Sequence, residues 1–453
     1  MARTNATPIF LPQNFDFETL VRHAFENQRD DTNASSTSSP LSSVPSSPER
    51  STLALDDLGT SINPQVPIAE VADAPPVVKK SRSKLQSKKN RQLKRAAQKA
   101  EITPETYSSP PSKKPRVQKS IAVDVTLDQL RASKNGFTGY HTEYGNDVYT
   151  LDDMTGPNSQ FKYKKVTWDG RSDIAIVTQD GYQIVHCIGL ADTKTWPAAA
   201  ERMANTLGNA KPILTGKAAD NRRGGFGALS AGVSCDLGMK RKQPKVVGQA
   251  NASNQRLVDS LLQDTDIIRV AGYQSAAFFH CQPTLYQQYA DNRTSLKEQL
   301  CNLTWNFKNS IFAHVTFNFG PQTVCVEHTD FGNRADGFCA VTALSPTCGG
   351  YDYTKGGHLI LWDLGLVIEF PPGTTILLLS AILRHSNVAI APDERRFSFT
   401  QYTPGSLFRW VERGYRTEKA FWASLTSDET VEEKRKDGSR WKDSFVNFTK
   451  FRA

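Results

Sequence analysis

The residues of this chain best suited to chemistry are two histidines and an aspartate in a strand-rich region. His328 and Asp330 are separated by one residue, and His385 follows much later in the chain. Two imidazoles and one carboxylate on one face of an ion leave three adjacent positions open on Fe(II), where an oxidant and O2 can bind. The pattern therefore indicates a redox enzyme with a ferrous centre.

The spacing of these ligands places a requirement on the fold. Side chains on a strand alternate between faces, so His328 and Asp330 project the same way and can hold one ion together. His385 can reach that ion only if the sheet folds back on itself. The intervening chain suits this, because glycines and prolines separate four apolar, β-rich runs, at 338–344, 358–362, 366–370 and 375–379. We predict an antiparallel barrel or sandwich with its core at about 312–410.

Arg396 and Ser398 form a second candidate site, again with one residue between them. A guanidinium fork together with a hydroxyl can clamp a carboxylate through two hydrogen bonds. A dicarboxylate fits such a clamp. Taken singly, an arginine is more often an ion-pair residue and a histidine more often a strand-end residue. The order of all five residues, each at a strand position, favours a functional site.

The order HxD, distal His, then Arg-x-Ser resembles that of the Fe(II)- and 2-oxoglutarate-dependent dioxygenases, over about 320–405. The resemblance implies a double-stranded β-helix, or jelly-roll, core. It implies that His328, Asp330 and His385 bind Fe(II). It also implies that Arg396 and Ser398 hold the far carboxylate of 2-oxoglutarate, the co-substrate used with O2.

Neighbouring residues narrow the resemblance to the TET/JBP family of DNA methylcytosine oxidases. Asn333 stands three residues after Asp330, where the family places an Asn or Asp that contacts the flipped base. Tyr402 stands six residues after Arg396, where the family places a ring against the base. The alternatives are a turn residue for Asn333 and a core aromatic for Tyr402. Pro404 replaces a histidine with which several members contact the base, so that contact is absent or comes from elsewhere.

The run 356–387 is similar to the TET/JBP-like proteins expanded in mushroom-forming fungi, many of which travel with transposons. The resemblance implies oxidation of 5-methylcytosine in DNA to its hydroxymethyl, formyl and carboxyl forms, and hence DNA demethylation. One alternative is a dioxygenase acting on N6-methyladenine or on another methylated nucleic acid or protein. A second alternative is a catalytically silent, transposon-associated DNA-binding protein.

Positive charge is concentrated near the N-terminus. The net charge is +9, and residues 1–120 hold 18 Lys plus Arg against 12 Asp plus Glu. The Ser/Pro-rich segment 34–48 cannot bury a core, so we expect a disordered basic arm. Basic runs at 79–99 and 112–117 predict nuclear import and suit a DNA partner. Apolar residues at 15–25 predict either a weakly ordered helix or a docking peptide for a protein partner.

A glycine-rich segment, Asn221 to Gly227, carries the adjacent arginines Arg222 and Arg223, and a basic triplet follows at 240–242. Glycines allow close backbone approach and arginines reach phosphates, so Arg223 is a candidate DNA contact. The alternative is an ordinary connection. The third glycine of a dinucleotide-binding fingerprint is missing, which argues against that motif.

We expect an α+β dioxygenase domain at 121–415. Its first part should brace the barrel with strands at 123–130 and 173–187 and a helix at 196–207. A helical layer should follow at 254–300, broken near Gly272 and Pro283.

The segment 416–453 reads as a charged helical extension. The seven cysteines show no metal-cluster spacing, so structural zinc is not expected. Together with the absence of a long apolar run, they predict a reduced, soluble protein that does not enter a membrane. The sequence does not indicate an oligomeric state.

Overall fold

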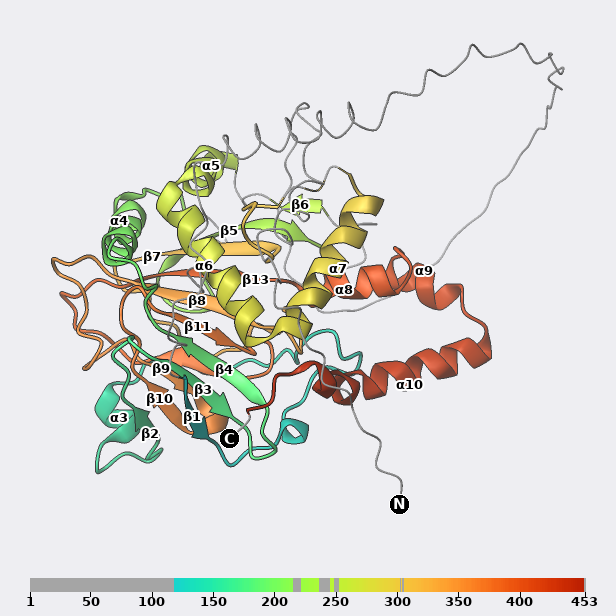
Figure 1. The fold of residues 1–453 in the computed structure, drawn as a ribbon, viewed down its shortest axis with the longest axis horizontal. Helices are drawn as coiled ribbons and strands as arrows, with labels where there is room; N and C mark the ends of the chain where they lie inside the picture. The colour runs from blue at the N-terminus through green and yellow to red at the C-terminus, as the bar shows by residue number, and fades with distance from the viewer. Residues whose placement is uncertain are drawn as a thin grey trace, which may run out of the picture. The chain divides into compact units, whose positions relative to one another are not determined.

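The apolar runs of the C-terminal half form the strands of two facing sheets in the computed structural model (Figure 1). The described residues are 118–214, 221–235, 245–247, 252–301, 303 and 305–451. The predictions for the N-terminal arm and for the triplet 240–242 lie outside them. The mixed α+β class, with two sheets and covering helices, is confirmed.

Within the described residues, the larger sheet has nine strands and the smaller has four. The larger sheet runs in the order β1 (Gln118–Ala122), β3 (Asp173–Val177), β4 (Gln183–Ile188), β11 (Thr375–Leu378), β8 (Cys339–Leu344), β13 (Phe397–Tyr402), β7 (His314–Phe319), β5 (Gly227–Ser234) and β6 (Lys245–Val247). The smaller sheet runs in the order β12 (His385–Asn387), β9 (Leu359–Leu361), β10 (Leu366–Ile368) and β2 (Lys164–Val166).

From β7 onward the chain passes back and forth between the two sheets. It leaves β7 in the larger sheet, pairs at His328 with His385 of the smaller sheet, and returns to β8. It then crosses to β9 and β10, returns to β11, crosses to β12 and ends at β13. The sheet does fold back on itself, as the ligand spacing requires.

Helices cover one side of the larger sheet (Figure 1). The side chain of Trp196 donates to the carbonyl of Gly373 at 3.0 Å, and Gln274 donates to Thr342 Oγ1 at 2.8 Å. Buried polar contacts of this kind fix the register of helices against strands. The helices of this layer are α4 (Trp196–Asn209), α5 (Gln255–Gln263), α6 (Thr265–Cys281) and α7 (Pro283–Gln299).

The predicted break near Pro283 is confirmed, but the one near Gly272 is wrong. Helix α6 continues through Gly272, and the break falls at Asp264, whose carboxylate accepts from the backbone N–H of Asp266 and Ile267. A Cβ at Gly272 would lie 2.3 Å from the side-chain nitrogen of Asn309. This glycine therefore serves close packing.

The predicted strand at 123–130 is also wrong. The strand β1 ends at Ala122, and a 3-10 helix at Leu127–Gln129 follows. Thr126 and Gln129 form a capping box, in which the backbone N–H of Thr126 donates to Gln129 Oε1 at 2.7 Å. Local capping thus outweighs the β-branched composition of this segment.

The remaining short elements are a helix, α3 (Leu151–Thr155), and 3-10 helices at Ala252–Asn254, Trp362–Leu364 and Ser444–Asn447. Among the described residues, none of the helices has the combined length and apolar character needed to cross a membrane.

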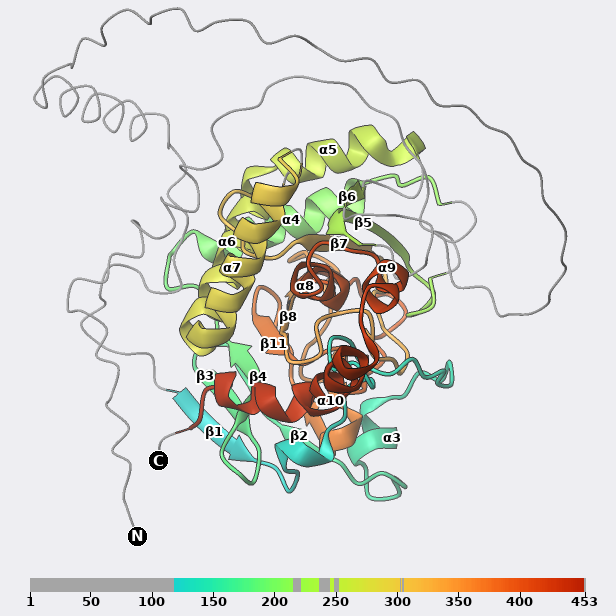
Figure 2. The ribbon, with the colours of Figure 1, turned by 90° about the vertical axis from the view of Figure 1, so that its right-hand side faces the viewer.

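The C-terminal segment 416–453 contains helices and is anchored to the main core. Its path can be followed in Figure 2, where the red helices lead to the neighbourhood of β1, β3 and β4. Trp441 donates to the carbonyl of Leu130 at 2.6 Å, and Phe448 is buried in the main hydrophobic cluster. The helices of the extension are α9 (Glu418–Ala423) and α10 (Ser427–Asp443), and α8 (Gly405–Glu412) precedes it.

Replacing Arg413 by Ala should destabilise the fold, because this buried guanidinium joins the C-terminal helices. Arg413 is paired with Glu418 at 2.7 Å and with Asp437 at 3.0 Å. Removing it takes one of two arginine partners from each carboxylate, since Arg409 also pairs with Glu418 and Arg440 also pairs with Asp437. The change should cost about 1–2 kcal/mol. Urea unfolding measures this. Arg435→Ala, on the exposed face of α10, is the control and should cost less than about 0.5 kcal/mol; equal losses would refute the anchoring role.

Candidate metal centre and its cavity

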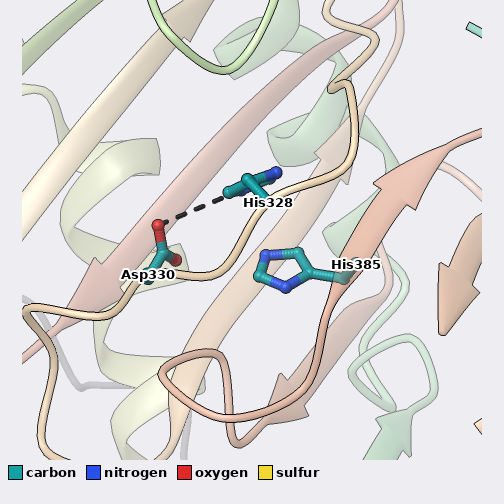
Figure 3. A group of neighbouring side chains, drawn as sticks. All are labelled: His328, Asp330 and His385. Atoms are coloured by element: carbon teal, nitrogen blue, oxygen red, sulfur yellow. Dashed lines mark ion pairs between the residues drawn. The ribbon is translucent and has the colours of Figure 1, made fainter. Parts of the chain in front are cut away.

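The three predicted ligands converge between the two sheets. His328 and His385 lie directly opposite each other on antiparallel segments and exchange backbone hydrogen bonds of 3.1 and 2.9 Å. Opposite residues of such a pair project to the same side. Asp330 joins them from the His328 segment, and the ligand atoms of all three lie within 4.8 Å of one another (Figure 3).

Each histidine is oriented by a carbonyl of its own backbone segment. The Nδ1 of His328 lies 2.8 Å from the carbonyl of Val326, and the Nδ1 of His385 lies 2.9 Å from the carbonyl of Leu383. A carbonyl only accepts, so Nδ1 carries the proton and Nε2 keeps its lone pair for an ion. Burial lowers the pKa of both imidazoles below the usual value, which keeps them neutral.

Asp330 is held ionised mainly by Arg223, the residue interpreted from the sequence as a candidate DNA contact. Burial alone would raise its pKa, but the nearby Arg223, His328, His385 and Arg222 together outweigh burial and hold that pKa well below its usual range, with Arg223 the largest of the four. Arg223 donates to Asp330 Oδ1 from Nη2 at 2.6 Å and from Nε at 3.0 Å. In this structure Arg223 therefore faces the metal carboxylate. A contact of Arg223 with DNA stays a prediction.

Replacing Arg223 by Met should weaken metal binding about 10- to 100-fold, the usual cost of losing a partner of a metal ligand. Without Arg223, burial would raise the pKa of Asp330, so a proton would compete with the metal as pH falls. The deficit should grow from pH 8 to pH 6. Co(II) titration against a chelator measures it, and Arg223→Lys should retain part of the affinity. A deficit independent of pH would contradict this electrostatic role.

The ligands line a cavity that opens to solvent, with about 640 Å³ of empty space when the open solvent at its mouth is included. One wall is formed by β13. Every second side chain of this strand, Ser398, Thr400 and Tyr402, faces the cavity, as the alternation of a strand requires. The remaining lining residues come from both sheets and from the segments joining them: Arg223, Thr316, Asn318, Cys325, His328, Asp330, Val341, Leu359, Phe370, Ile376, Leu378, His385, Asn387 and Arg396.

Arg396 brings a buried cation to this cavity. Its side chain is 1% exposed, and its Nη1 donates to the carbonyl of Thr323 at 2.6 Å. The Nε atom is buried without a hydrogen-bond partner among the described residues. The guanidinium also lies 5.6 Å from the ring centroids of Tyr351 and Phe370. A buried guanidinium with spare donors suits an anionic ligand.

Ser398 lies on the same wall and is paired in register with Asn318 of β7. The Asn318 amide donates to Ser398 Oγ at 2.9 Å, so the hydroxyl proton of Ser398 is left to donate to a ligand. Asn318 was missed in the sequence. Its signal was the alternation of polar residues along His314 to Phe319, which places Asn318 on the face of Thr316.

The two predicted base contacts differ in placement. Tyr402 lines the cavity, stacks on His314 with ring centroids 5.0 Å apart, and has its hydroxyl 3.3 Å from Thr316 Oγ1. Asn333 is buried outside the cavity lining, and its amide donates to Ser380 Oγ at 3.0 Å. This arrangement matches the turn-stabilising alternative for Asn333. Base contact stays a prediction for both residues.

The donor set fits the cofactors that the sequence implies. His328, Asp330 and His385 form a candidate metal site consistent with Fe(II), with two neutral imidazoles and one ionised carboxylate. Arg396 and Ser398 offer spare donors to a carboxylate in the same cavity. Candidate ligands for an ion and donors for a carboxylate therefore line one cavity.

Comparison with known proteins yields distant likenesses in fold. No protein-family model matches the chain, and no curated protein matches it. One similar solved structure is NgTET1 in complex with 5mC DNA, with a TM-score of 0.35 and 15% identity over 56% of this chain and 87% of that chain. Another is an oxidoreductase of the 2OG-Fe(II) oxygenase family from Burkholderia pseudomallei, with a TM-score of 0.23 and 15% identity over 44% and 76%.

Proposed function

We propose that this protein is an Fe(II)- and 2-oxoglutarate-dependent dioxygenase that oxidises 5-methylcytosine in DNA. The observation that carries the proposal is a shared cavity. Two neutral imidazoles and an ionised carboxylate meet at one point of it, and a buried guanidinium with unused donors lies in the same cavity. The passage of strands between two sheets supports a double-stranded β-helix core.

His328, Asp330 and His385 would hold Fe(II), and Arg396 with Ser398 would hold the far carboxylate of 2-oxoglutarate. When bound, the ferrous ion supplies the activation of O2, coupled to decarboxylation of the co-substrate to succinate. The protein itself positions the reactants and excludes water. Apolar side chains between the polar groups serve the exclusion, namely Val341, Leu359, Ile376 and Leu378.

The choice of 5-methylcytosine is supported by the resemblance of the runs 328–333 and 396–402 to the TET/JBP motifs. The expected products are 5-hydroxymethyl-, 5-formyl- and 5-carboxylcytosine. We place the chain in the fungal, transposon-associated branch of TET-like proteins and in the nucleus. The resemblance of 356–387 and the basic runs of the arm support these two assignments.

Incubation with methylated DNA, Fe(II), 2-oxoglutarate and O2, followed by mass spectrometry of the nucleosides, tests this function. DNA carrying 5-methylcytosine should yield its oxidised forms together with succinate. DNA carrying only N6-methyladenine is the comparison substrate, because Pro404 replaces a base-contacting histidine of the family. Products from methyladenine alone would refute the cytosine assignment, and absence of succinate with either DNA would refute the dioxygenase.

A further inference from the structure

Two adjacent arginines share one carboxylate unequally beside the metal centre. Arg223 lies 2.6 Å from Asp330 Oδ1, whereas Arg222 lies 3.8 Å from the same atom. Among the residues that the structure describes, Asp330 is the one carboxylate within 4.0 Å of Arg222. Because Arg223 makes the closer contact with Asp330, Arg222 has only this longer ion pair, in which one carboxylate is shared by two arginines.

Arg222 is held in place although it is exposed. Its side chain is 49% exposed, and its Nη2 donates to the carbonyl of Thr329 at 3.3 Å. Its guanidinium lies 5.5 Å from the ring centroid of Phe331. A guanidinium fixed in this way loses little side-chain freedom when an anion binds.

Aromatic side chains adjoin this guanidinium. Phe331 follows the ligand Asp330 directly, and the exposed ring of His141 meets it edge-on at 4.5 Å. Gly139 fixes this approach, because its N–H donates to the carbonyl of Phe331 at 2.8 Å. A Cβ at Gly139 would lie 1.9 Å from the carbonyl oxygen of Ala381, so the position requires glycine. The next residue, Tyr140, is 47% exposed.

We propose that Arg222 binds a backbone phosphate of the nucleic acid that is being oxidised, and that Phe331 and His141 support the adjoining nucleotide. This inference rests on the proposed function, since it concerns the substrate of the same site. A fork of N–H donors matches the oxygens of a phosphodiester, and flat rings beside it suit a base or sugar. If the anion bound by Arg222 were a small free carboxylate, Phe331 and His141 would have nothing to contact.

The salt dependence of DNA binding by the full chain tests the proposal. Fluorescence anisotropy with a methylated duplex across a salt series gives the slope of log affinity against log salt. For Arg222→Met the magnitude of this negative slope should fall by about 0.9, because one phosphate contact is lost and one counterion fewer is released on binding. At 0.1 M salt, the same relation predicts about an eightfold loss of affinity. Inorganic phosphate as competitor shows whether a free anion alone occupies the site.

Two further variants make the result specific. Arg222→Lys keeps the charge and should keep a slope near that of the parent protein. Arg435→Met removes an exposed arginine whose ion pair lies within α10, and it should leave the slope unchanged. An unchanged slope in Arg222→Met would overturn the proposal, and so would an equal loss in Arg222→Lys or displacement of DNA by millimolar phosphate. Succinate release, measured separately, decides the proposed function independently of these slopes.

Discussion

Replacing His328 by Ala should abolish succinate release, with a loss of more than about a thousandfold, because an open facial site needs all three of its ligands. The Nε2 atom of His328 lies 3.9 Å from Asp330 Oδ1, and its ring centroid lies 4.2 Å from that of His385. Each of the three therefore faces the same point. Mass spectrometry of succinate and of DNA nucleosides measures the loss.

Asp330→Ala should give the same loss of turnover, but it also leaves Arg223 without its carboxylate. His328→Ala avoids this complication and is the cleaner test. His280→Asn is the matched control, since His280 is an exposed residue of α6 outside the cavity lining. DNA affinity should stay within about twofold in each variant, because phosphate contacts dominate it. Turnover retained by His328→Ala would remove this residue from the ligand set.

Replacing Arg396 by Met should raise the KM for 2-oxoglutarate by about 30-fold or more. Loss of one partner of a buried, hydrogen-bonded charge pair costs about 2–5 kcal/mol of binding free energy. The same change should lower the free energy of unfolding by only about 1–2 kcal/mol, because the buried carbonyl of Thr323 loses its donor while methionine keeps the site filled. Steady-state kinetics with varied 2-oxoglutarate and urea unfolding give the two quantities.

Arg395 offers the matched control for Arg396. It is the preceding residue, it is exposed, and its guanidinium donates to the carbonyl of Cys348 away from the cavity. Arg395→Met should leave the KM for 2-oxoglutarate unchanged. If Arg396→Met kept an unchanged KM, Arg396 would be a structural cation, and the co-substrate assignment would have to be withdrawn.

The sequence predicted the convergence of the metal ligands because their spacing is a local property. His328 and Asp330 are two residues apart and reach the same point, although the segment pairs only through an isolated bridge at His328. Apolar runs with turn residues marked the strands that return His385 to them. Arg223 could not be placed in the same way. Its partner Asp330 is 107 residues away, and nothing near Arg223 in the sequence distinguishes a metal-site arginine from a phosphate contact.

The wrong element boundaries have physical causes as well. Thr126 and Gln129 carried a capping signal within a segment whose valines favoured a strand. Gly272 had the mark of a helix break, but its small size accommodates the side chain of Asn309, a contact between distant segments. Tertiary packing of this kind leaves no local pattern. The anchoring of the C-terminal extension through Trp441 was invisible for the same reason.

The two candidate histidine ligands are held by the backbone and not by the ion. Each imidazole Nδ1 is hydrogen-bonded to the carbonyl two residues before it, and the backbones of His328 and His385 are paired with each other. Stripping the ion should consequently leave both rings where they are. We expect the chelator-treated protein to bind metal again rapidly and repeatedly, with no refolding delay between removal and reloading. It should also accept Mn(II) or Co(II) as catalytically inactive substitutes for spectroscopy.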